Sequence, residues 1–266
     1  MSDWERKVEE AVFHDRRERL RHTAPEEFEQ MTRNHRFYAV NRASKRFMEK
    51  WLREHCTPGR RVLDYCCGGG LNTLFIAECG ADVVGIDISA ESLRAARVRL
   101  KSEGLGDRSL FVVADAERTA FADGTFDIIL CNGVLHHLDL APAFAELSRI
   151  LKPHGKVFCV EALAHNPVFQ LYRRLTPHMR TSWELNHILS RRQIEFARRY
   201  FGSVETHFFH LASLLAVPFR RRPRVFERVL AVLDGVDRVL LSVPGLRWWS
   251  WQCLFVLGKP RRVTHG

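Results

Sequence analysis

Residues 61 to 72 read Arg-Val-Leu-Asp-Tyr-Cys-Cys-Gly-Gly-Gly-Leu-Asn, and this stretch decides the expected fold. An apolar strand ends in the carboxylate of Asp64, the chain turns through three glycines, and a helix-like run follows. Glycines at such a turn permit positive φ and let a ligand approach the backbone, while the free amides of the following helix favour a negative group. The stretch therefore predicts a nucleoside pocket between a strand and a helix.

The residues around the turn favour one kind of nucleoside over another. A dinucleotide-binding turn carries its third glycine three residues after the second, and here that place is held by Thr73. The carboxylate of Asp64, placed before the glycines, repels a pyrophosphate and suits a ligand with an ammonium and a sulfonium. A cationic nucleoside is therefore expected in place of a dinucleotide.

This segment resembles the first motif of the class I S-adenosylmethionine-dependent methyltransferases, Asp/Glu-x-Gly-x-Gly-x-Gly. Asp64, Gly68 and Gly70 match the motif, and Cys66 stands where the family has its first glycine. A small side chain can occupy this turn if its φ is negative. The resemblance implies S-adenosylmethionine as the cofactor.

Later segments carry the remaining expected contacts. Asp87 lies 17 residues after Gly70, at the end of an apolar run, where a carboxylate accepts hydrogen bonds from ribose hydroxyls. The resemblance implies that Asp115 accepts from the adenine amino group and that the Ala116 amide meets the ring edge. The full set of expected cofactor-binding residues is Asp64, Cys66, Gly68, Gly70, Asp87, Ile88, Asp115, Ala116, Asn132 and Tyr38.

Short apolar runs alternate with helix-like segments along the first 160 residues. Strands are expected at 82–87, 110–114, 126–131 and 156–160, with a loop at 152–155 and a helix over 89–100 that Ser89 caps. This order predicts an α/β fold with a doubly wound, Rossmann-like, mostly parallel sheet and helices on both faces. The resemblance implies seven strands, the last antiparallel, with 208–211 and 252–258 as the final two.

The chain reads as one domain with additions at both ends. An N-terminal helical extension is expected over residues 1–55, and the methyltransferase domain over 56–266, with substrate-capping segments at about 162–200 and 212–249. Residues 1–24 hold six basic and six acidic side chains. They predict a solvated helix ending near Pro25, which acts as a lid, a dimer contact or a flexible arm.

Composition indicates a cytoplasmic enzyme. With 266 residues and 46% hydrophobic side chains, the chain can bury a large core without disulfides. No apolar run approaches the ~20 residues of a membrane span, and the charged N-terminus does not resemble a signal peptide. The seven cysteines form no Cys-x-x-Cys pair, so reduced thiols are expected, with Cys66 and Cys67 serving in packing.

The basic charge is concentrated after residue 164. Residues 165–266 hold 17 Lys+Arg and 6 Asp+Glu, whereas residues 1–164 hold 24 and 25. Within the basic part, Arg220, Arg221, Arg222 and Arg224 precede an amphipathic run at 225–243 and the pair Trp248-Trp249. Three interpretations stay open: a helix with solvated arginines, a segment contacting an anionic membrane surface, and a site for an acidic substrate or carrier.

Nucleic acid is not favoured as a partner despite the net charge of +10. Enzymes that methylate base amino groups usually carry an Asn/Asp-Pro-Pro-aromatic motif after the fourth strand, where this chain has Asn-Gly-Val-Leu at 132–135. The following Val-Leu-His-His-Leu run resembles the small-molecule branch of the family. A small-molecule substrate is therefore expected, and the oligomeric state stays open.

Methyl transfer needs mainly placement, but an oxygen acceptor must also lose a proton. His136, His137 and Glu161 are the candidate catalytic residues, although the histidines also suit a helix entry and Glu161 a turn cap. Tyr38 and Arg42 are candidates to close the cofactor from the other side. No metal site is expected, because the histidines are scattered along the chain.

The sequence thus predicts a methyltransferase that transfers a methyl group from S-adenosylmethionine to a small molecule, with oxygen favoured as the acceptor atom. A lipophilic acceptor such as an isoprenoid, a quinone or another natural product is attractive because of the apolar insertion with its tryptophans. The alternative is a protein that binds S-adenosylmethionine without methyl transfer: a cyclase, a decarboxylase or a silent partner subunit.

Overall fold

The computed structural model describes residues 2–179, 181–184 and 187–261. Residues 180, 185 and 186 of the expected substrate-capping segment, and residues 262–266, lie outside the described part. A seven-stranded sheet forms the centre, in the order β3-β2-β1-β4-β5-β7-β6. The strands are β1 (Arg61–Tyr65), β2 (Asp82–Asp87), β3 (Ser109–Val113), β4 (Phe126–Asn132), β5 (Leu151–Ala162), β6 (Phe201–Phe209) and β7 (Gln252–Pro260).

The strand directions confirm the expected fold class. Strands β1 to β5 pair in parallel, whereas β7 runs antiparallel to both β5 and β6. The expected loop at 152–155 is wrong, because β5 begins at Leu151 and carries these residues within the strand, beside a register irregularity against β4. The strand expected at 208–211 begins earlier and ends at Phe209.

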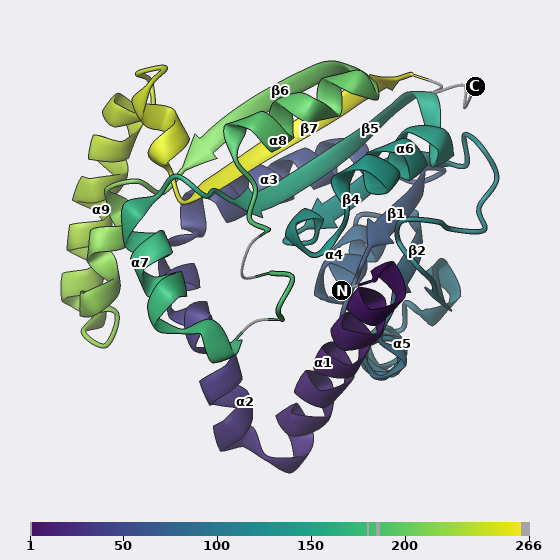
Figure 1. Ribbon diagram of the computed structural model, residues 1–266, viewed down its shortest axis with the longest axis horizontal. Helices are drawn as coiled ribbons and strands as arrows, with labels where there is room; N and C mark the ends of the chain where they lie inside the picture. The colour runs from purple at the N-terminus through teal and green to yellow at the C-terminus, as the bar shows by residue number, and fades with distance from the viewer. Residues whose placement is uncertain (1, 180, 185–186, 262–266) are drawn as a thin grey trace.

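Helices cover both faces of the sheet (Figure 1). Side chains that alternate along the strands enter two separate cores, since neighbouring residues of a strand point to opposite faces. Val62 of β1 joins the core with helices α3, α4 and α5, whereas Leu63 joins the core with α6 and α8. These helices are α3 (Arg42–His55), α4 (Leu71–Glu78), α5 (Ala90–Ser102), α6 (Leu140–Ile150) and α8 (Arg191–Phe196).

A third apolar core lies beyond the sheet, where the insertions meet. It joins Phe169 of α7, Leu214 of the 3-10 helix η6 and Phe226 of α9 with Trp251 before β7. These segments lie on the left of Figure 1. Their bounds are α7 (Pro167–Leu175), η6 (Ser213–Phe219), α9 (Pro223–Leu240) and η7 (Leu246–Trp249).

The N-terminal segment forms α1 (Asp3–Thr23), α2 (Pro25–Met31) and the 3-10 helix η1 (Arg33–Val40). Helix α1 begins with a full capping box, in which Ser2 and Glu5 each accept from the other's backbone amide. It ends before Pro25, which starts α2. Helix α1 is not the solvated helix expected from the sequence, because Arg6, Glu10 and Glu18 are buried.

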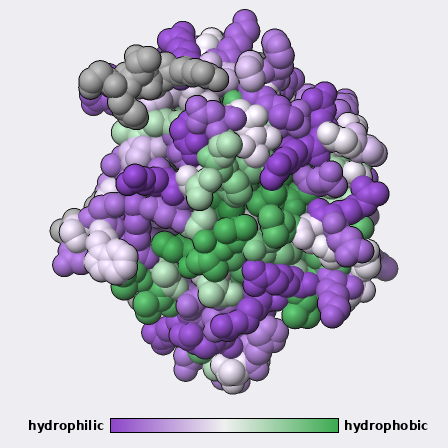
Figure 2. Space-filling model, turned by 90° about the vertical axis from the view of Figure 1, so that its right-hand side faces the viewer, coloured by the Kyte–Doolittle hydropathy of each residue, from purple (hydrophilic) through white to green (hydrophobic). Residues whose placement is uncertain are grey.

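Figure 2 shows the right-hand side of Figure 1, where apolar side chains form a continuous area ringed by hydrophilic ones. The arginine-rich insertion around α9 lies on the opposite, left-hand side of Figure 1, so this apolar area belongs to other parts of the chain. Within the described residues, no helix combines the length and the apolar character that crossing a membrane requires.

Candidate functional site

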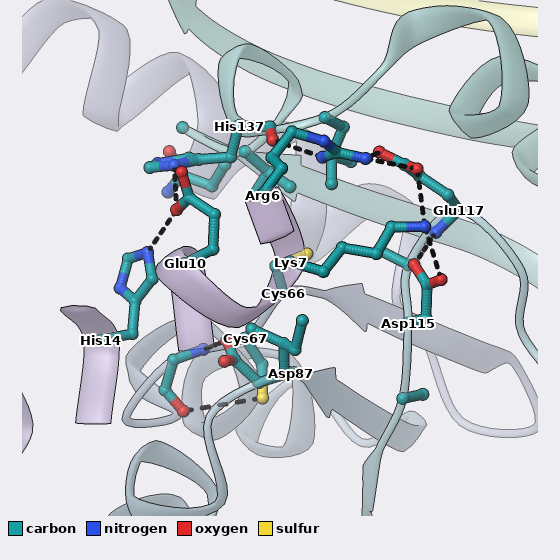
Figure 3. A pocket seen from close by; sticks show the side chains of 18 of the residues that line it. Arg6, Lys7, Glu10, His14, Cys66, Cys67, Asp87, Asp115, Glu117 and His137 are labelled. Atoms are coloured by element: carbon teal, nitrogen blue, oxygen red, sulfur yellow. Dashed lines mark hydrogen bonds and ion pairs between the residues drawn. The ribbon is translucent and has the colours of Figure 1, made fainter. Parts of the chain in front are cut away.

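A cavity of about 260 Å³ lies between helix α1 and the carboxyl ends of β1, β2, β3 and β4 (Figure 3). Loops at this edge of a parallel sheet commonly hold ligands. Seven of the ten residues expected to bind a cofactor line the cavity together: Cys66, Gly68, Asp87, Ile88, Asp115, Ala116 and Asn132. The other three, Asp64, Gly70 and Tyr38, do not line it.

The glycine turn shapes the floor of the cavity. Gly68 has a φ of 51°, and its amide donates to Asp87 Oδ2 at 2.9 Å. Gly70 has a φ of 75°, and a Cβ there would lie 2.8 Å from the Cβ of Ala96. Gly70 therefore permits α4 to pack against α5, whereas Gly68 leaves open space toward the cavity.

Cys66 departs from its expected conformation. Its φ is +58°, in the left-handed region that glycine adopts without strain, so the condition of a negative φ is not met. Cys66 therefore carries a side chain at a backbone conformation that favours glycine. Cys66 and Cys67 are both free thiols, and both line the cavity.

Asp64 lies beneath the turn. The residue is 1% exposed, and Thr73 at the start of α4 donates to its Oδ2 at 2.6 Å. Burial raises the pKa of Asp64 to about 7 despite this hydrogen bond, and nearby Asp87 adds to the rise. Asp64 therefore fastens β1 to α4, and the same Thr73 that breaks the dinucleotide spacing is its partner.

Asp87 and Asp115 present carboxylates at the ends of β2 and β3. Asp87 Oδ1 accepts from the Ser89 amide at 2.8 Å while Oδ2 accepts from Gly68, so both oxygens are oriented by backbone. Asp115 Oδ1 accepts from the Glu117 amide at 2.9 Å, and Oδ2 pairs with Lys7 Nζ at 2.9 Å. Ala116 is buried and lines the cavity next to Asp115, and Asn132 Nδ2 donates to Asn72 Oδ1 at 3.4 Å.

Helix α1 covers the cavity with charged side chains, which sequence reasoning missed. Arg6, Lys7, Glu10, His14 and Arg17 all line the cavity from one side of this helix. Their spacing of four, four and three residues from Arg6 to Arg17 is that of one helical face, and this was the available signal.

Two contacts at the ends of this face fasten α1 to the sheet domain. Arg6 is 3% exposed, and its Nη2 lies 2.7 Å from both carboxylate oxygens of Glu117, which is 6% exposed. Asp15 Oδ1 accepts from Ser89 Oγ at 2.6 Å, next to the start of α5. Helix α1 is thus held by ion pairs and hydrogen bonds on its cavity side.

Arg17 differs from the other charged residues on this face. Within the described ranges, its guanidinium makes no hydrogen bond or ion pair with another side chain. Burial lowers the pKa of Arg17, against the opposing effects of Glu184 and Asp87. A partly buried guanidinium without a bonded partner in the chain suits an anionic group of a ligand in this cavity.

The candidate base His137 is enclosed by carboxylates. Its Nδ1 lies 3.0 Å from Glu10 Oε2 and its Nε2 lies 3.0 Å from Glu184 Oε1. Burial favours the neutral ring, but Glu184 and Glu10 outweigh burial and raise the pKa of His137 to about 9. With both nitrogens paired, an imidazolium at neutral pH has no lone pair with which to accept a proton.

The candidates His136 and Glu161 form a pair outside this cavity. Glu161 is 1% exposed; its Oε1 accepts from the amides of Val134 and Leu135, and its Oε2 lies 2.8 Å from His136 Nδ1. Glu161 therefore orients the 3-10 helix η3 (Leu135–His137) as well as the His136 ring. His136 borders a second cavity of about 220 Å³, whose wall it shares with Leu138, Trp183 and His187.

The expected closing residues Tyr38 and Arg42 lie elsewhere. Tyr38 packs edge-on against Trp251 at 5.3 Å between ring centroids and borders a neighbouring cavity with Asn72 and Asn132. Arg42 forms an ion pair with Glu227 of α9. Arg42 therefore joins α3 to the insertion and does not reach the cofactor cavity.

The arginine-rich insertion is largely exposed. Arg221, Arg222 and Arg224 are exposed. Some apolar residues of the insertion are exposed as well, among them Leu215, which is 61% exposed. The two neighbouring tryptophans differ, because Trp249 is 53% exposed whereas Trp248 is 7% exposed and packs edge-on against Phe208. Of these two tryptophans, only Trp249 is thus available for a contact at the surface.

Residues 63–159 match a protein family described as a methyltransferase domain. A curated relative, the ubiquinone biosynthesis O-methyltransferase of Thiobacillus denitrificans, is 39% identical over 101 residues, which cover 38% of this chain and 43% of the relative. The chain spans about half the length of the curated relatives that it matches.

Solved structures share the fold at low sequence identity. A geranyl diphosphate methyltransferase in complex with GPP and sinefungin superposes with a TM-score of 0.57 at 21% identity, covering 81% of this chain and 78% of that one. The [4+2]-cyclase SpnF superposes with a TM-score of 0.54 at 20% identity, covering 80% of each chain.

Proposed function

Because residues 63–159 belong to the methyltransferase domain family, with the class I fold that uses S-adenosylmethionine, we propose that this chain transfers a methyl group to an oxygen atom of a small, lipophilic molecule. The observation that carries the proposal is the convergence of Cys66, Gly68, Asp87, Asp115 and Asn132 on one cavity. These residues come from four different strand ends, as a nucleoside site on a doubly wound sheet requires.

The residues at the cavity suit the parts of S-adenosylmethionine. Asp87 offers two backbone-oriented oxygens for the ribose hydroxyls, and Asp115 offers an acceptor for the adenine amino group. Arg17 suits the carboxylate of the methionine part, because it is the cation of this cavity that lacks a bonded partner among the described residues. The cofactor supplies an activated methyl group, so the chain has to place the acceptor and exclude water.

Helix α1 has to shift for the cofactor to enter. The cavity of about 260 Å³ is smaller than the ~300–1,000 Å³ typical of ligand pockets, and Lys7 occupies Asp115 Oδ2. A helix held by polar contacts can separate from the domain without exposing a large apolar surface. We therefore expect α1 to open for binding and to close over the bound cofactor.

The acceptor chemistry is supported by two similarities. The relative from Thiobacillus denitrificans is named as an O-methyltransferase, which supports oxygen as the acceptor atom. The solved structure of a geranyl diphosphate methyltransferase in complex with GPP supports a lipophilic acceptor, but not the choice of oxygen. An oxygen acceptor needs a base, and His136 suits this role better than His137, because one ring nitrogen of His136 is held by Glu161 while the other lies 3.9 Å from the nearest carboxylate. The second cavity, beside His136 and Trp183, is the proposed place of the acceptor.

Labelled cofactor tests the proposed reaction. The purified chain is incubated with S-adenosylmethionine that carries a trideuterated methyl group and with a panel of prenylated phenols and hydroquinones. Formation of S-adenosylhomocysteine together with a product heavier by one labelled methyl group supports transfer, and cleavage of the product by boron tribromide identifies an O-methyl ether. Binding of the cofactor without S-adenosylhomocysteine formation, across the panel and a metabolite extract, would support the alternative of a cyclase, a decarboxylase or a silent subunit.

The base is tested separately. His136→Ala is expected to lower kcat about 100-fold and to leave the affinity for S-adenosylmethionine unchanged, since general base catalysis contributes roughly 10²–10⁴-fold. His165→Ala provides the matched control, because His165 contacts the Arg191 amide and lies outside both cavities. An unchanged kcat in His136→Ala contradicts the role of His136.

We further propose that the arginine-rich insertion contacts an anionic membrane surface, from which a lipophilic acceptor could be drawn. The exposed arginines beside the exposed side chains of Leu215, Phe219 and Trp249 support this proposal. Vesicles of phosphatidylserine and phosphatidylcholine are expected to co-sediment with the chain at low salt, and pure phosphatidylcholine vesicles are not. The membrane proposal is contradicted if a variant co-sediments with the phosphatidylserine vesicles as well as the unchanged chain does. This variant has Arg220, Arg221, Arg222 and Arg224 changed to Gln.

A further inference from the structure

Three metal-ligating side chains meet on one wall of the cofactor cavity. Glu10 and His14 come from neighbouring turns of α1, and His137 comes from η3. Glu10 Oε2 lies 3.4 Å from His14 Nε2 and 3.0 Å from His137 Nδ1, and all three ligand atoms lie within 4.8 Å of one another (Figure 3). The group could not be recognised from the sequence, because 123 residues separate His14 from His137.

The separations suit a bound ion. Ligand atoms about 2.0–2.1 Å from zinc at tetrahedral angles lie roughly 3.3 Å apart, and both measured separations from Glu10 are close to that value. Glu10 and His14 are four residues apart on a helix, a spacing that places two ligands on one face. Only small movements of the side chains are therefore needed to admit an ion.

The ligands also have the outer partners that metal sites use. His137 Nε2 lies 3.0 Å from Glu184 Oε1, so a carboxylate holds the ring nitrogen opposite the one that faces the other ligands. The second oxygen of Glu10 accepts from Thr181 Oγ1 at 2.5 Å. A carboxylate behind a ligating histidine fixes the tautomer and the orientation of the ring.

Two other groups of metal-ligating residues among the described residues fit less well. In the group of His210, Asp234 and Asp237, Asp237 accepts from the amides of Leu211, Ala212 and Ser213, and His210 bonds to two serine hydroxyls. Its donor atoms are thus already used within the fold. The remaining group, His136, His137 and Glu184, shares His137 with the first group, and in it Glu184 already pairs with His137 Nε2 at 3.0 Å.

We propose that Glu10, His14 and His137 bind one divalent transition-metal ion, with Zn²⁺ the ion that this set of two nitrogens and one carboxylate suits best. The ion replaces the proton between His137 Nδ1 and Glu10, which is released to solvent, while the proton on His137 Nε2 keeps its contact with Glu184 Oε1. The ion joins α1 to η3 and keeps at least one coordination position directed into the cavity. That position can take a water molecule. Mg²⁺ prefers oxygen ligands and is expected to bind much more weakly.

Metal binding is measured on the full chain without cofactor or acceptor. After EDTA treatment and gel filtration, calorimetric titration with ZnCl₂ is expected to show one tight site per chain, and titration with MgCl₂ none of comparable affinity. Mass spectrometry of the dialysed protein gives the stoichiometry. Absence of a stoichiometric zinc ion overturns the proposal, whereas failure of the methyl-transfer assay alone leaves it standing, because the two measurements are independent.

Variants assign the site. His14→Ala is expected to weaken zinc binding at least 100-fold, whereas His22→Ala, on the same helix but with a 74% exposed side chain, keeps the affinity of the unchanged chain. Glu184→Gln removes the charge behind His137 and is expected to weaken binding about 10- to 100-fold. Thermal unfolding verifies that each variant folds.

Cobalt provides a second measurement that does not depend on a single variant. Co²⁺ bound by these ligands is expected to give visible absorption bands that zinc displaces and that change in Glu184→Gln. Zinc affinity unchanged in both His14→Ala and Glu184→Gln places any bound zinc on other histidines and overturns the assignment. A loss confined to these two variants supports it.

Discussion

Helices α1 and α9 are both additions to the sheet, yet they are attached in opposite ways. Helix α9 buries Phe226 and Leu230 in an apolar core, and its Asp237 accepts from three backbone amides after β6. Helix α1 buries Arg6, Glu10 and Glu18, and its apolar residues Trp4, Val8 and Val12 are exposed. The apolar addition therefore supports the fold, whereas the charged addition covers the cavity that we propose as the cofactor site.

The largest effect is expected from the removal of one buried charge of α1, which tests whether an ion pair holds this helix. Arg6→Ala removes the buried cation from Glu117, which keeps only Lys7 Nζ at 3.1 Å and the Asp139 amide as described partners, and is expected to lower the free energy of unfolding by about 3 kcal/mol. Urea unfolding measures the loss. Arg19→Ala, an exposed position on the same helix, is the control.

A double variant that removes both charges of the buried ion pair tests the same contact. Arg6→Met combined with Glu117→Leu replaces the buried pair with apolar side chains and is expected to recover most of the stability. A stability of Arg6→Ala equal to that of Arg19→Ala shows that α1 is not held by this ion pair.

The attachment of α9 is expected to weaken at acid pH. His210, 1% exposed, lies at the end of β6 near Asp237, and burial lowers the pKa of His210 to about 4. In the unfolded chain, His210 takes up a proton near pH 6.5, whereas in the folded chain it does so only near pH 4. The contribution of neutral His210 to the free energy of unfolding is therefore present above pH 6.5 and is lost as the pH falls toward 4. At about 1.4 kcal/mol per pKa unit, the loss amounts to about 3 kcal/mol.

Urea unfolding at pH 7 and pH 4.5 measures this loss. His210→Asn removes the titrating ring and is expected to show a smaller decrease between the two pH values than the unchanged chain, whereas exposed His22→Asn on α1 shows the same decrease. Equal decreases in His210→Asn and the unchanged chain contradict the role of His210.

The third prediction concerns the sheet side of the cavity. Asp87→Ala removes the two charged hydrogen bonds that we propose to the ribose, each worth about 1.5 kcal/mol, and is expected to weaken S-adenosylmethionine binding about 100-fold. Calorimetric titration measures the affinity. Asp82→Ala, at the exposed start of the same strand, is expected to bind as tightly as the unchanged chain, and a similar affinity in the two variants would count against the cofactor site.

A high salt concentration is expected to weaken the attachment of α1 slightly and to leave the attachment of α9 unchanged. At 1 M NaCl the Debye length falls to about 3 Å, which weakens the partly exposed pairs of α1, such as Lys7 with Asp115. Hydrogen exchange of α1 amides is expected to accelerate about fivefold, and that of α9 amides to stay unchanged. Equal acceleration in both helices contradicts the contrast between them.

The smallest expected effect lies in the glycine turn between the two additions. Cys66→Gly removes a side chain from a residue with a φ of +58° and is expected to stabilise the fold by about 1 kcal/mol. Thermal unfolding measures the shift, and Cys67→Gly, at a neighbouring residue outside the left-handed region, serves as the comparison. A destabilised Cys66→Gly shows that packing of the thiol outweighs the backbone strain.

The sequence predicted the sheet well because its signals are local. Apolar runs, short loops and the glycine turn identified the strand ends that carry Asp87, Asp115 and Asn132, and all three line the cavity. The same reasoning treated residues 152–155 as a loop, because a proline and a glycine read as breakers, although pairing with β4 and β7 draws the segment into β5. Tertiary pairing there overrides local propensity.

The covering side of the site was less predictable. The charges of residues 1–24 sum to zero and indicate a solvated helix, because no apolar stripe marks a buried face. Their partners, among them Glu117 and His137, lie more than 100 residues away along the chain. Pairing between such distant charges leaves no periodic signal in either segment.

By itself, the sequence determined the methyltransferase fold and the cavity edge that suits S-adenosylmethionine, since the alternation of strand and helix fixes which strand ends meet. Only the tertiary structure decided that α1 covers this edge, that Arg42 turns to α9, and that Glu10, His14 and His137 come together. The physical reason is that apolar periodicity is written into each segment, whereas the choice of partner for a charged side chain depends on which distant segment the folded chain places beside it.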